Sequence, residues 1–332
     1  MSIGSLQYTI PFWTSISVAN HTAPTCIEIC AGAGGQAIGL ERAGFRHLAL
    51  VEIEKEYCRT LQTNRPDWNV INEDVKAYQA DRIEDLDLFA GGVPCPPFSF
   101  AGKQLGHKDE RDLFPEAIRL IAALLPRAIM LENVRGLFAP RFKEYRQHIQ
   151  SSIESLGYRI YWQLLNASDY GVPQLRPRTI LVGIRNDINT TFHFPKQQEK
   201  RCSVGEALFD LISENGWPQA YQWKEQAINV APTIVGGSKK HGGPDLGPTR
   251  AKKAWASLGI DGSGIGNNAP DADFEGMPRL TNRMVARLQG FPDDWTFAGT
   301  KTNVYRQIGN AFPPPVAEAI GKEILKCIKK RG

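Results

Sequence analysis

The sequence predicts an α/β protein with a doubly wound, mostly parallel sheet and a smaller irregular unit, and three observations support this. From residue 25 to about residue 183, short apolar runs alternate with amphipathic stretches, as in successive βα units. A glycine-rich turn directly follows the first apolar run. After about residue 195 the chain becomes rich in Gly, Pro, Ser and Asn and loses clear periodicity.

Six apolar runs have the length and bounding residues of buried strands. They cover residues 25–31, 47–53, 68–72, 86–92, 127–134 and 178–184. Apolar residues recur at helical spacing in residues 111–125, where Pro115 suits a first turn. Residues 279–291 and 316–330 are also predicted to be amphipathic helices, the second starting near Pro315.

The composition is that of an ordinary globular protein, with 42% hydrophobic and 22% charged residues among 332. No apolar run approaches the roughly 20 residues that a membrane helix needs, and the N-terminus lacks the pattern of a secretory signal. We therefore expect a cytoplasmic protein without membrane contact. The six cysteines are scattered, and Cys26 and Cys30 have no matching ligand pair, so no metal site is expected.

Positive charge is concentrated in residues 231–255, although the whole chain carries a formal net charge of only +4. That stretch contains five basic residues and one acidic residue, Asp245. Either a solvated surface loop or a loop that contacts phosphates is consistent with the pattern. The basic residues are Lys239, Lys240, Arg250, Lys252 and Lys253.

The glycine-rich turn predicts a nucleotide-like cofactor, because glycines let the backbone approach a ligand and the following helix N-terminus offers free N–H groups. Gly32, Gly34 and Ala37 also satisfy the dinucleotide pattern, with Glu52 about 20 residues further on, so an NAD-dependent dehydrogenase stays possible here. Glu52 suits the hydroxyls of a ribose, and Asp74, after the third run, suits an adenine amino group.

A stiff proline frame surrounds one thiol, in the segment GGVPCPPFS. Cys95 follows the fourth predicted strand, at the edge where open α/β sheets bind ligands. Glu132 ends the next strand, while Arg176 and Arg178 alternate before the last one and so are expected to point to one face. A thiol, a carboxyl and two guanidiniums on one rim indicate nucleophilic addition to an electron-poor ring or carbonyl.

These segments together resemble the DNA (cytosine-5) methyltransferases, and they stand in the family's order. The matching blocks are EICAGAGG, VEIEK, EDV, GGVPCPPFS, DERDLF, LENVRG, YGVPQLRPR, RLTNRMVARLQGFPDDW and YRQIGNAFPPPVAEAI. Two positions depart from the common pattern: Cys30 stands where an aromatic residue is usual, and Pro96 where many members have Gln.

The resemblance implies a catalytic domain that binds S-adenosylmethionine, formed by residues 1–195 and 302–332. It implies a target-recognition domain at residues 196–278, called the recognition segment below, and a hinge at residues 279–301. The cofactor-binding residues implied are Cys30, Gly32, Gly34, Gly35, Glu52, Ile53, Asp74, Val75 and Asn310.

For catalysis the resemblance implies Cys95 as nucleophile, Glu132 at the cytosine edge near N3, Arg178 facing O2 and Arg176 ordering the site. The target would be a cytosine flipped out of double-stranded DNA, with the basic residues above contacting the backbone. A monomeric modification enzyme with a cognate restriction endonuclease is expected. An orphan regulatory methyltransferase, a tRNA methyltransferase and an inactive DNA-binding relative are the alternatives.

Overall fold

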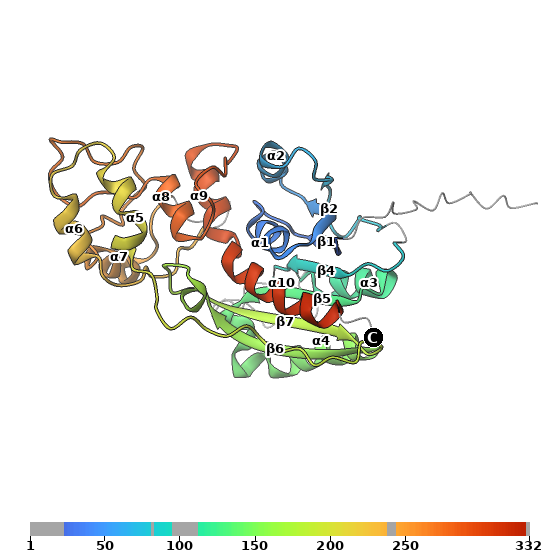
Figure 1. The fold of residues 1–332 in the computed structure, drawn as a ribbon. Helices are drawn as coiled ribbons and strands as arrows, with labels where there is room; N and C mark the ends of the chain where they lie inside the picture. The colour runs from blue at the N-terminus through green and yellow to red at the C-terminus, as the bar shows by residue number, and fades with distance from the viewer. Residues whose placement is uncertain (1–22, 81–82, 95–111, 238–243, 330–332) are drawn as a thin grey trace, which may run out of the picture.

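The computed structural model describes residues 23–80, 83–94, 112–237 and 244–329. Among these residues no helix has the length and apolar character needed to cross a membrane. A seven-stranded sheet with the order β3-β2-β1-β4-β5-β7-β6 forms the centre of the larger part of the molecule (Figure 1).

The strands meet the expectation of a doubly wound, mostly parallel sheet. In this sheet β7 is antiparallel to both of its neighbours, and the other pairs of adjacent strands are parallel. Their bounds are β3 (Val70–Asn72), β2 (Arg46–Glu52), β1 (Thr25–Ile29), β4 (Leu88–Gly92), β5 (Ala128–Val134), β7 (Pro177–Arg185) and β6 (Tyr158–Asn166).

Strand β6 was not predicted from the sequence. It is an edge strand paired antiparallel with β7, and most of its side chains are only partly buried. Ile160 and Trp162 pack on one face of the sheet while Tyr161 packs on the other. With apolar side chains on both faces, the segment shows neither a continuous buried run nor a clean alternation, and its aromatic residues were the available signal.

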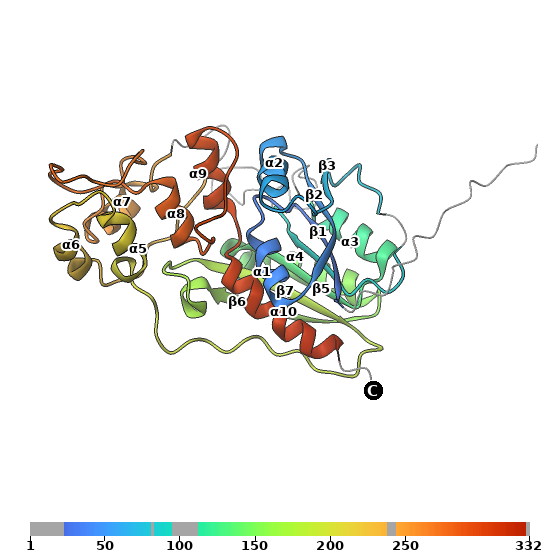
Figure 2. The same cartoon turned by 45° about the horizontal axis from the view of Figure 1, so that its top comes forward.

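Helices cover both faces of the sheet (Figures 1 and 2). One layer contains α1 (Gly35–Ala43) and the C-terminal helix α10 (Pro314–Ile328), and the other contains α3 (Phe114–Leu124) and α4 (Lys143–Glu154). Alternate strand residues serve the two layers: Leu88 and Ala90 of β4 face α10, while Phe89 faces α3. The helices predicted around residues 111–125 and 316–330 are therefore present.

Helix α10 returns the chain to the sheet by crossing α1 at very short distance. A Cβ at Gly39 would lie 2.4 Å from the Pro314 carbonyl oxygen and 2.5 Å from Ala317 Cβ. At Gly321 the nearest atom, Ala43 Cβ, would be 2.9 Å away. Only glycine at these positions allows the contact, which fixes the C-terminal segment beside the glycine turn at the start of α1.

A second group of helices lies beside the sheet, at the left of Figure 1. Its core contains Trp217, Trp223 and Trp255, all nearly covered. Sequence periodicity did not predict α5, α6 or α7, because each helix is short and irregular segments lie between them. The group comprises α5 (Val204–Ser213), α6 (Ala220–Gln226), α7 (Thr249–Ala256), α8 (Asn282–Leu288) and α9 (Lys301–Asn310).

Helix α8 is the amphipathic helix predicted in residues 279–291, and its buried face belongs to the same core as the recognition segment. The domain boundaries given above stay a prediction. The remaining short elements are α2 (Lys55–Asn64) and the 3-10 helices η2 (Arg135–Phe138), η3 (Pro140–Phe142) and η4 (Ala167–Tyr170).

Candidate active site and cofactor pocket

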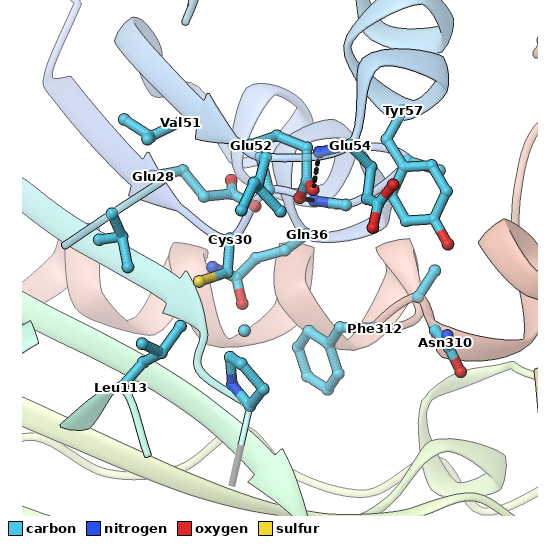
Figure 3. A pocket seen from close by; sticks show the side chains of 18 of the residues that line it. Glu28, Cys30, Gln36, Val51, Glu52, Glu54, Tyr57, Leu113, Asn310 and Phe312 are labelled. Carbon is cyan, nitrogen blue, oxygen red and sulfur yellow. Dashed lines mark hydrogen bonds between the residues drawn. The ribbon is translucent and has the colours of Figure 1, made fainter. Parts of the chain in front are cut away.

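An open pocket of about 700 Å³ lies at the carboxyl ends of β1, β2, β4 and β5 (Figure 3). From β1 the chain winds outward to β2 and β3, and from β4 it winds the other way to β5. The pocket thus lies at the point where the winding reverses, which is where doubly wound sheets bind ligands. Its volume falls in the range of roughly 300–1,000 Å³ usual for cofactor sites.

The glycine turn forms one wall of the pocket. Cys30 and Gly32 both have a left-handed backbone, with φ of 52° and 57°, and this bends the chain sharply between β1 and α1. Gly32 and Gly35 line the cavity as predicted, while Gly34 does not appear in its lining. A Cβ at Gly34 would lie 2.8 Å from Leu61 and 2.9 Å from Trp295, so this glycine permits close packing behind the turn.

Glu52 is held by the backbone on both carboxylate oxygens. The N–H of Gly32 donates to Oε2 at 2.8 Å, and the N–H of Glu54 donates to Oε1 at 2.9 Å. Burial raises the pKa of Glu52, and these backbone hydrogen bonds oppose the rise. Each oxygen keeps a lone pair for a ligand hydroxyl, and the geometry therefore suits the two hydroxyls of a ribose.

Five more of the predicted cofactor residues line the pocket, together with residues that were not predicted. Ile53 is 58% exposed although apolar, and it borders the cavity next to Asp74 and Val75 at the ends of β2 and β3. Cys30 and Asn310 line it as well. Residues that sequence reasoning did not assign also contribute, among them Glu28, Gln36, Tyr57 and Phe312. Their signal was weak because each occurs within or next to a motif that another residue explained.

The predicted catalytic carboxyl and guanidinium lie together at the other end of the pocket. Arg178 Nε and Glu132 Oε1 are 2.7 Å apart, and each side chain is only 12% exposed. Burial raises the pKa of Glu132, and the positive charges of Arg178 and Arg176 oppose the rise. A raised pKa favours the protonated carboxyl, so this group is suited to donate a proton or a hydrogen bond.

The chain leaves β4 toward the predicted nucleophile next to this pair. Asn133 Nδ2 donates to the Val93 carbonyl at 2.7 Å, which ties the end of β5 to the exit of β4. Pro94 borders the pocket together with Glu132. Cys95 itself lies outside the described residues, so its role stays a prediction.

Arg176 has a different environment from Arg178, although both lie on the same segment. It is fully buried and donates hydrogen bonds to carbonyls of Ile234 at 2.7 Å, Gly309 at 2.7 Å and Ala311 at 3.0 Å. Burial lowers its pKa, as does the charge of Arg178. Arg176 therefore joins the strand that carries Arg178 to the recognition segment and to the end of α9.

Comparison with known proteins identifies the protein family to which the chain belongs. Residues 24–326 match the family model described as C-5 cytosine-specific DNA methylase. The chain belongs to this family.

Relatives agree with the family assignment, and solved structures show the same fold. The chain is 56% identical over 310 residues to the Type II methyltransferase M.NgoMIV of Neisseria gonorrhoeae, covering 92% of this chain and 98% of the relative. It is 54% identical to M.NaeI of Lentzea aerocolonigenes, covering 92% and 76%. The structure of a Spodoptera frugiperda DNMT2 mutant shares the fold, with a TM-score of 0.65, 17% identity and coverage of 91% and 100%. The Entamoeba histolytica methyltransferase EhMeth gives a TM-score of 0.62 at 17% identity, covering 93% and 100%.

As a DNA cytosine-5 methyltransferase, the enzyme takes its methyl group from S-adenosylmethionine, and the pocket fits that cofactor. Glu52 has acceptor capacity suited to ribose hydroxyls, Ile53 presents an exposed apolar side chain, and Asp74 lines the same pocket. A Cβ at Gly35 would lie 2.2 Å from the Phe312 carbonyl oxygen, so the turn and the C-terminal segment close together around the cavity. The dehydrogenase alternative, which the glycine pattern had left open, is excluded by the family.

Part of the predicted DNA-binding set lies on helix α7. Arg250 and Lys253 are exposed there, whereas Lys252 Nζ forms an ion pair of 2.9 Å with Asp245 Oδ2. Lys239 and Lys240 lie outside the described residues. Contact of these residues with DNA stays a prediction.

Proposed function

We propose that this enzyme methylates C5 of one cytosine within a specific sequence of double-stranded DNA, through a covalent bond between Cys95 and C6 of that cytosine. The buried pair of Glu132 and Arg178 is the observation that supports the proposal most strongly. Glu132 lines the cofactor pocket together with Pro94, the residue before the thiol.

The chemistry requires a nucleophile because C5 of cytosine is too weakly nucleophilic to accept a methyl group directly. Addition of the Cys95 thiolate to C6 forms a C–S bond and places electron density on C5 and N3. Glu132 stabilises this density by donating a hydrogen bond or a proton to N3, for which its raised pKa prepares it. Arg178 holds the carboxyl in place and offers donors to O2.

S-adenosylmethionine, when bound, supplies an electrophilic sulfonium methyl group at the C5 side of the base. The residues proposed to hold it are Glu52 at the ribose, Ile53, Asp74 and Val75 at the adenine, and Asn310 with the glycine turn at the amino-acid end. After methylation, C5 loses its proton to a base, which can be water. The C–S bond then breaks, and Cys95 leaves as the thiolate.

C6 cannot be reached inside a stacked duplex, so the cytosine must be flipped out, at a cost of a few kcal/mol in lost stacking. We propose that the recognition segment reads the flanking bases and that Arg250 and Lys253, with Lys239 and Lys240, contact phosphates. Two relatives that are 56% and 54% identical to this chain carry the name Type II methyltransferase. By analogy, we propose that this enzyme protects DNA from a cognate restriction endonuclease.

A transfer assay tests the proposal. Duplex DNA incubated with the enzyme and labelled S-adenosylmethionine should gain 5-methylcytosine, and Cys95→Ala should reduce transfer to background. Duplexes with 5-fluorocytosine at the target should trap a covalent complex with the wild type, because fluorine cannot leave as a proton does. Undiminished transfer by Cys95→Ala would refute the covalent route. Bisulfite sequencing of DNA from expressing cells identifies the sequence read.

A further inference from the structure

Gln36 is a buried amide in the wall of the cofactor pocket, and none of the residues that the structure describes forms a hydrogen bond with its side chain. It is the second residue of α1, directly after the glycine turn, and only 3% of it is exposed. Among the described residues, neither its Oε1 nor its Nε2 has a hydrogen-bond partner. A primary amide has two donor hydrogens and an acceptor oxygen, and leaving such groups buried and unpaired is costly. Because Gln36 lines the cofactor pocket, a bound ligand can supply the hydrogen-bond partners that the described residues do not.

The position of Gln36 in the pocket narrows the choice of partner. In Figure 3 its side chain extends toward Cys30, on the wall that also carries Glu28. Glu52, Ile53 and Asp74, which suit the adenosine, belong to the ends of β2 and β3 instead. This leaves Gln36 beside the portion of a bound cofactor that lies beyond the ribose.

The neighbouring carboxyl favours a cationic group at this wall. Glu28 is 1% exposed, and its Oε2 lies 3.5 Å from Nε2 of His47, which is also buried. That oxygen accepts no hydrogen bond from any residue that the structure describes. Burial raises the pKa of Glu28, and an approaching cation favours its ionised form, so this wall suits the α-ammonium of an amino acid better than its α-carboxylate.

We propose that Gln36 is a cofactor-binding residue that recognises the amino-acid end of S-adenosylmethionine. The amide oxygen accepts a hydrogen bond from the α-ammonium, and the amide N–H groups donate to the α-carboxylate. An amide complements this zwitterion because it presents an acceptor and donors side by side. The inference rests on the proposed function only in its use of this methyl donor.

Binding measurements without DNA separate this role from a structural one. S-adenosylhomocysteine keeps the amino-acid end, whereas 5′-methylthioadenosine lacks it and keeps the adenosine. Gln36→Met preserves the shape and removes the hydrogen bonds. We expect calorimetry to show about a tenfold to hundredfold weaker Kd for S-adenosylhomocysteine, as for loss of hydrogen bonds to charged groups. The Kd for 5′-methylthioadenosine should change less than twofold.

Glu52→Gln is the matched control, because a defect at the ribose should weaken the binding of both ligands to a similar extent. The Tm of ligand-free Gln36→Met should equal or exceed that of the wild type, since an unpaired buried amide is removed. If Gln36→Met does not fold, Gln36→Asn, which shortens the amide by one methylene, should show the same selective loss.

Three results would overturn the inference: an unchanged Kd for S-adenosylhomocysteine, an equal loss for both ligands, or a wild type that binds both ligands equally well. A wild type that binds neither ligand would instead contradict the cofactor on which the proposed function depends.

Discussion

In the cofactor pocket, the functional side chains lie at the ends of buried strands, whereas the recognition segment surrounds a tryptophan core with short helices and long loops. Glu52 ends β2, the glycine turn follows β1, and Glu132 lies near the carboxyl end of β5. In the recognition segment, Asp261 forms an ion pair of 2.8 Å with Arg279 at the start of the hinge. The sheet fixes where its strand ends lie, while the recognition segment depends on side-chain contacts specific to this chain.

Because of this difference, we expect the two regions to tolerate substitutions to different degrees. Around the pocket, small changes in volume or charge act on atoms packed to van der Waals contact. In the recognition segment, exposed groups can be exchanged at small cost to stability, and their effect appears in DNA binding instead. The variants below test this division, beginning with the largest expected effect.

Glu132→Gln should reduce the rate of methyl transfer by about 10²- to 10⁴-fold, the usual contribution of general acid catalysis. The amide still donates a hydrogen bond to N3 but supplies no proton. Because burial raises the pKa of Glu132, the wild-type rate should lose this contribution as the pH rises through that raised pKa. Single-turnover rates across pH measure both effects. Glu144→Gln, on the exposed face of α4, is the control, and a loss below tenfold at Glu132 would contradict the assigned role.

Gly39→Ala should destabilise the protein by about 1–3 kcal/mol or more, through overpacking against α10. Helix propensity alone would favour alanine by about 1 kcal/mol, so the sign of the result is informative. The added Cβ would lie 2.4 Å from the Pro314 carbonyl oxygen, an atom of rigid backbone. Gly264→Ala is the matched change in the recognition segment, where a Cβ would meet nothing closer than 3.5 Å. Urea denaturation should show little change in the stability of Gly264→Ala. Equal losses of stability in the two variants would contradict the proposed difference between the two regions.

The same contrast explains what could be predicted from the sequence. Strand ends were predictable because an apolar run must be buried and the polar residue after it must lie at the rim, as Glu52 and Glu132 do. Gly34 shows the limit: its cofactor contact stays a prediction, and the sequence did not indicate that a Cβ there would collide with Leu61 and Trp295. Gln36 gave no signal, because the lack of a partner for its buried amide among the described residues is apparent only once its surroundings are known.

In the recognition segment little beyond the composition could be predicted. Helix α5 has a capping box, with Ser203 and Glu206 exchanging hydrogen bonds, yet the surrounding loops hid its periodicity. Trp223 is held by a hydrogen bond from its Nε1 to the carbonyl of Leu258 at 2.9 Å. Such contacts join residues far apart in sequence that no local pattern relates, and the same holds for the way Arg176 reaches Ile234 and Gly309.

Replacing Arg250 or Lys253 by Ala should weaken DNA binding without changing stability. Each lost phosphate contact should reduce the slope of log K against log salt by about 0.9. Lys252→Ala should have a smaller effect, because Lys252 is already paired with Asp245 at 2.9 Å. Anisotropy titrations of a labelled duplex at several salt concentrations measure these slopes. Identical slopes for all three variants and the wild type would contradict the prediction that α7 contacts DNA.

The smallest expected effect concerns the N-terminus of α5, where Ser203→Ala should cost about 1 kcal/mol for loss of the cap. Ser203 Oγ accepts from the Glu206 N–H at 3.1 Å, and Glu206 Oε2 accepts from the Ser203 N–H at 2.8 Å. Ser213→Ala at the other end of the helix is the control, because that hydroxyl only donates to carbonyls within its own helix. Urea titrations compare the two variants.

The charge of Glu206 makes this cap dependent on pH. The hydrogen bonds from Ser203, together with Lys200, lower the pKa of Glu206 from 4.5 to about 2. A carboxyl with a lowered pKa stabilises the fold while it is ionised, so its contribution is complete above pH 4.5 and is lost as the pH falls toward 2. Wild type should therefore exceed Glu206→Gln in stability at pH 7, and the gap should close on acidification. A gap independent of pH would show that the shape of the side chain, and not its charge, holds the start of α5.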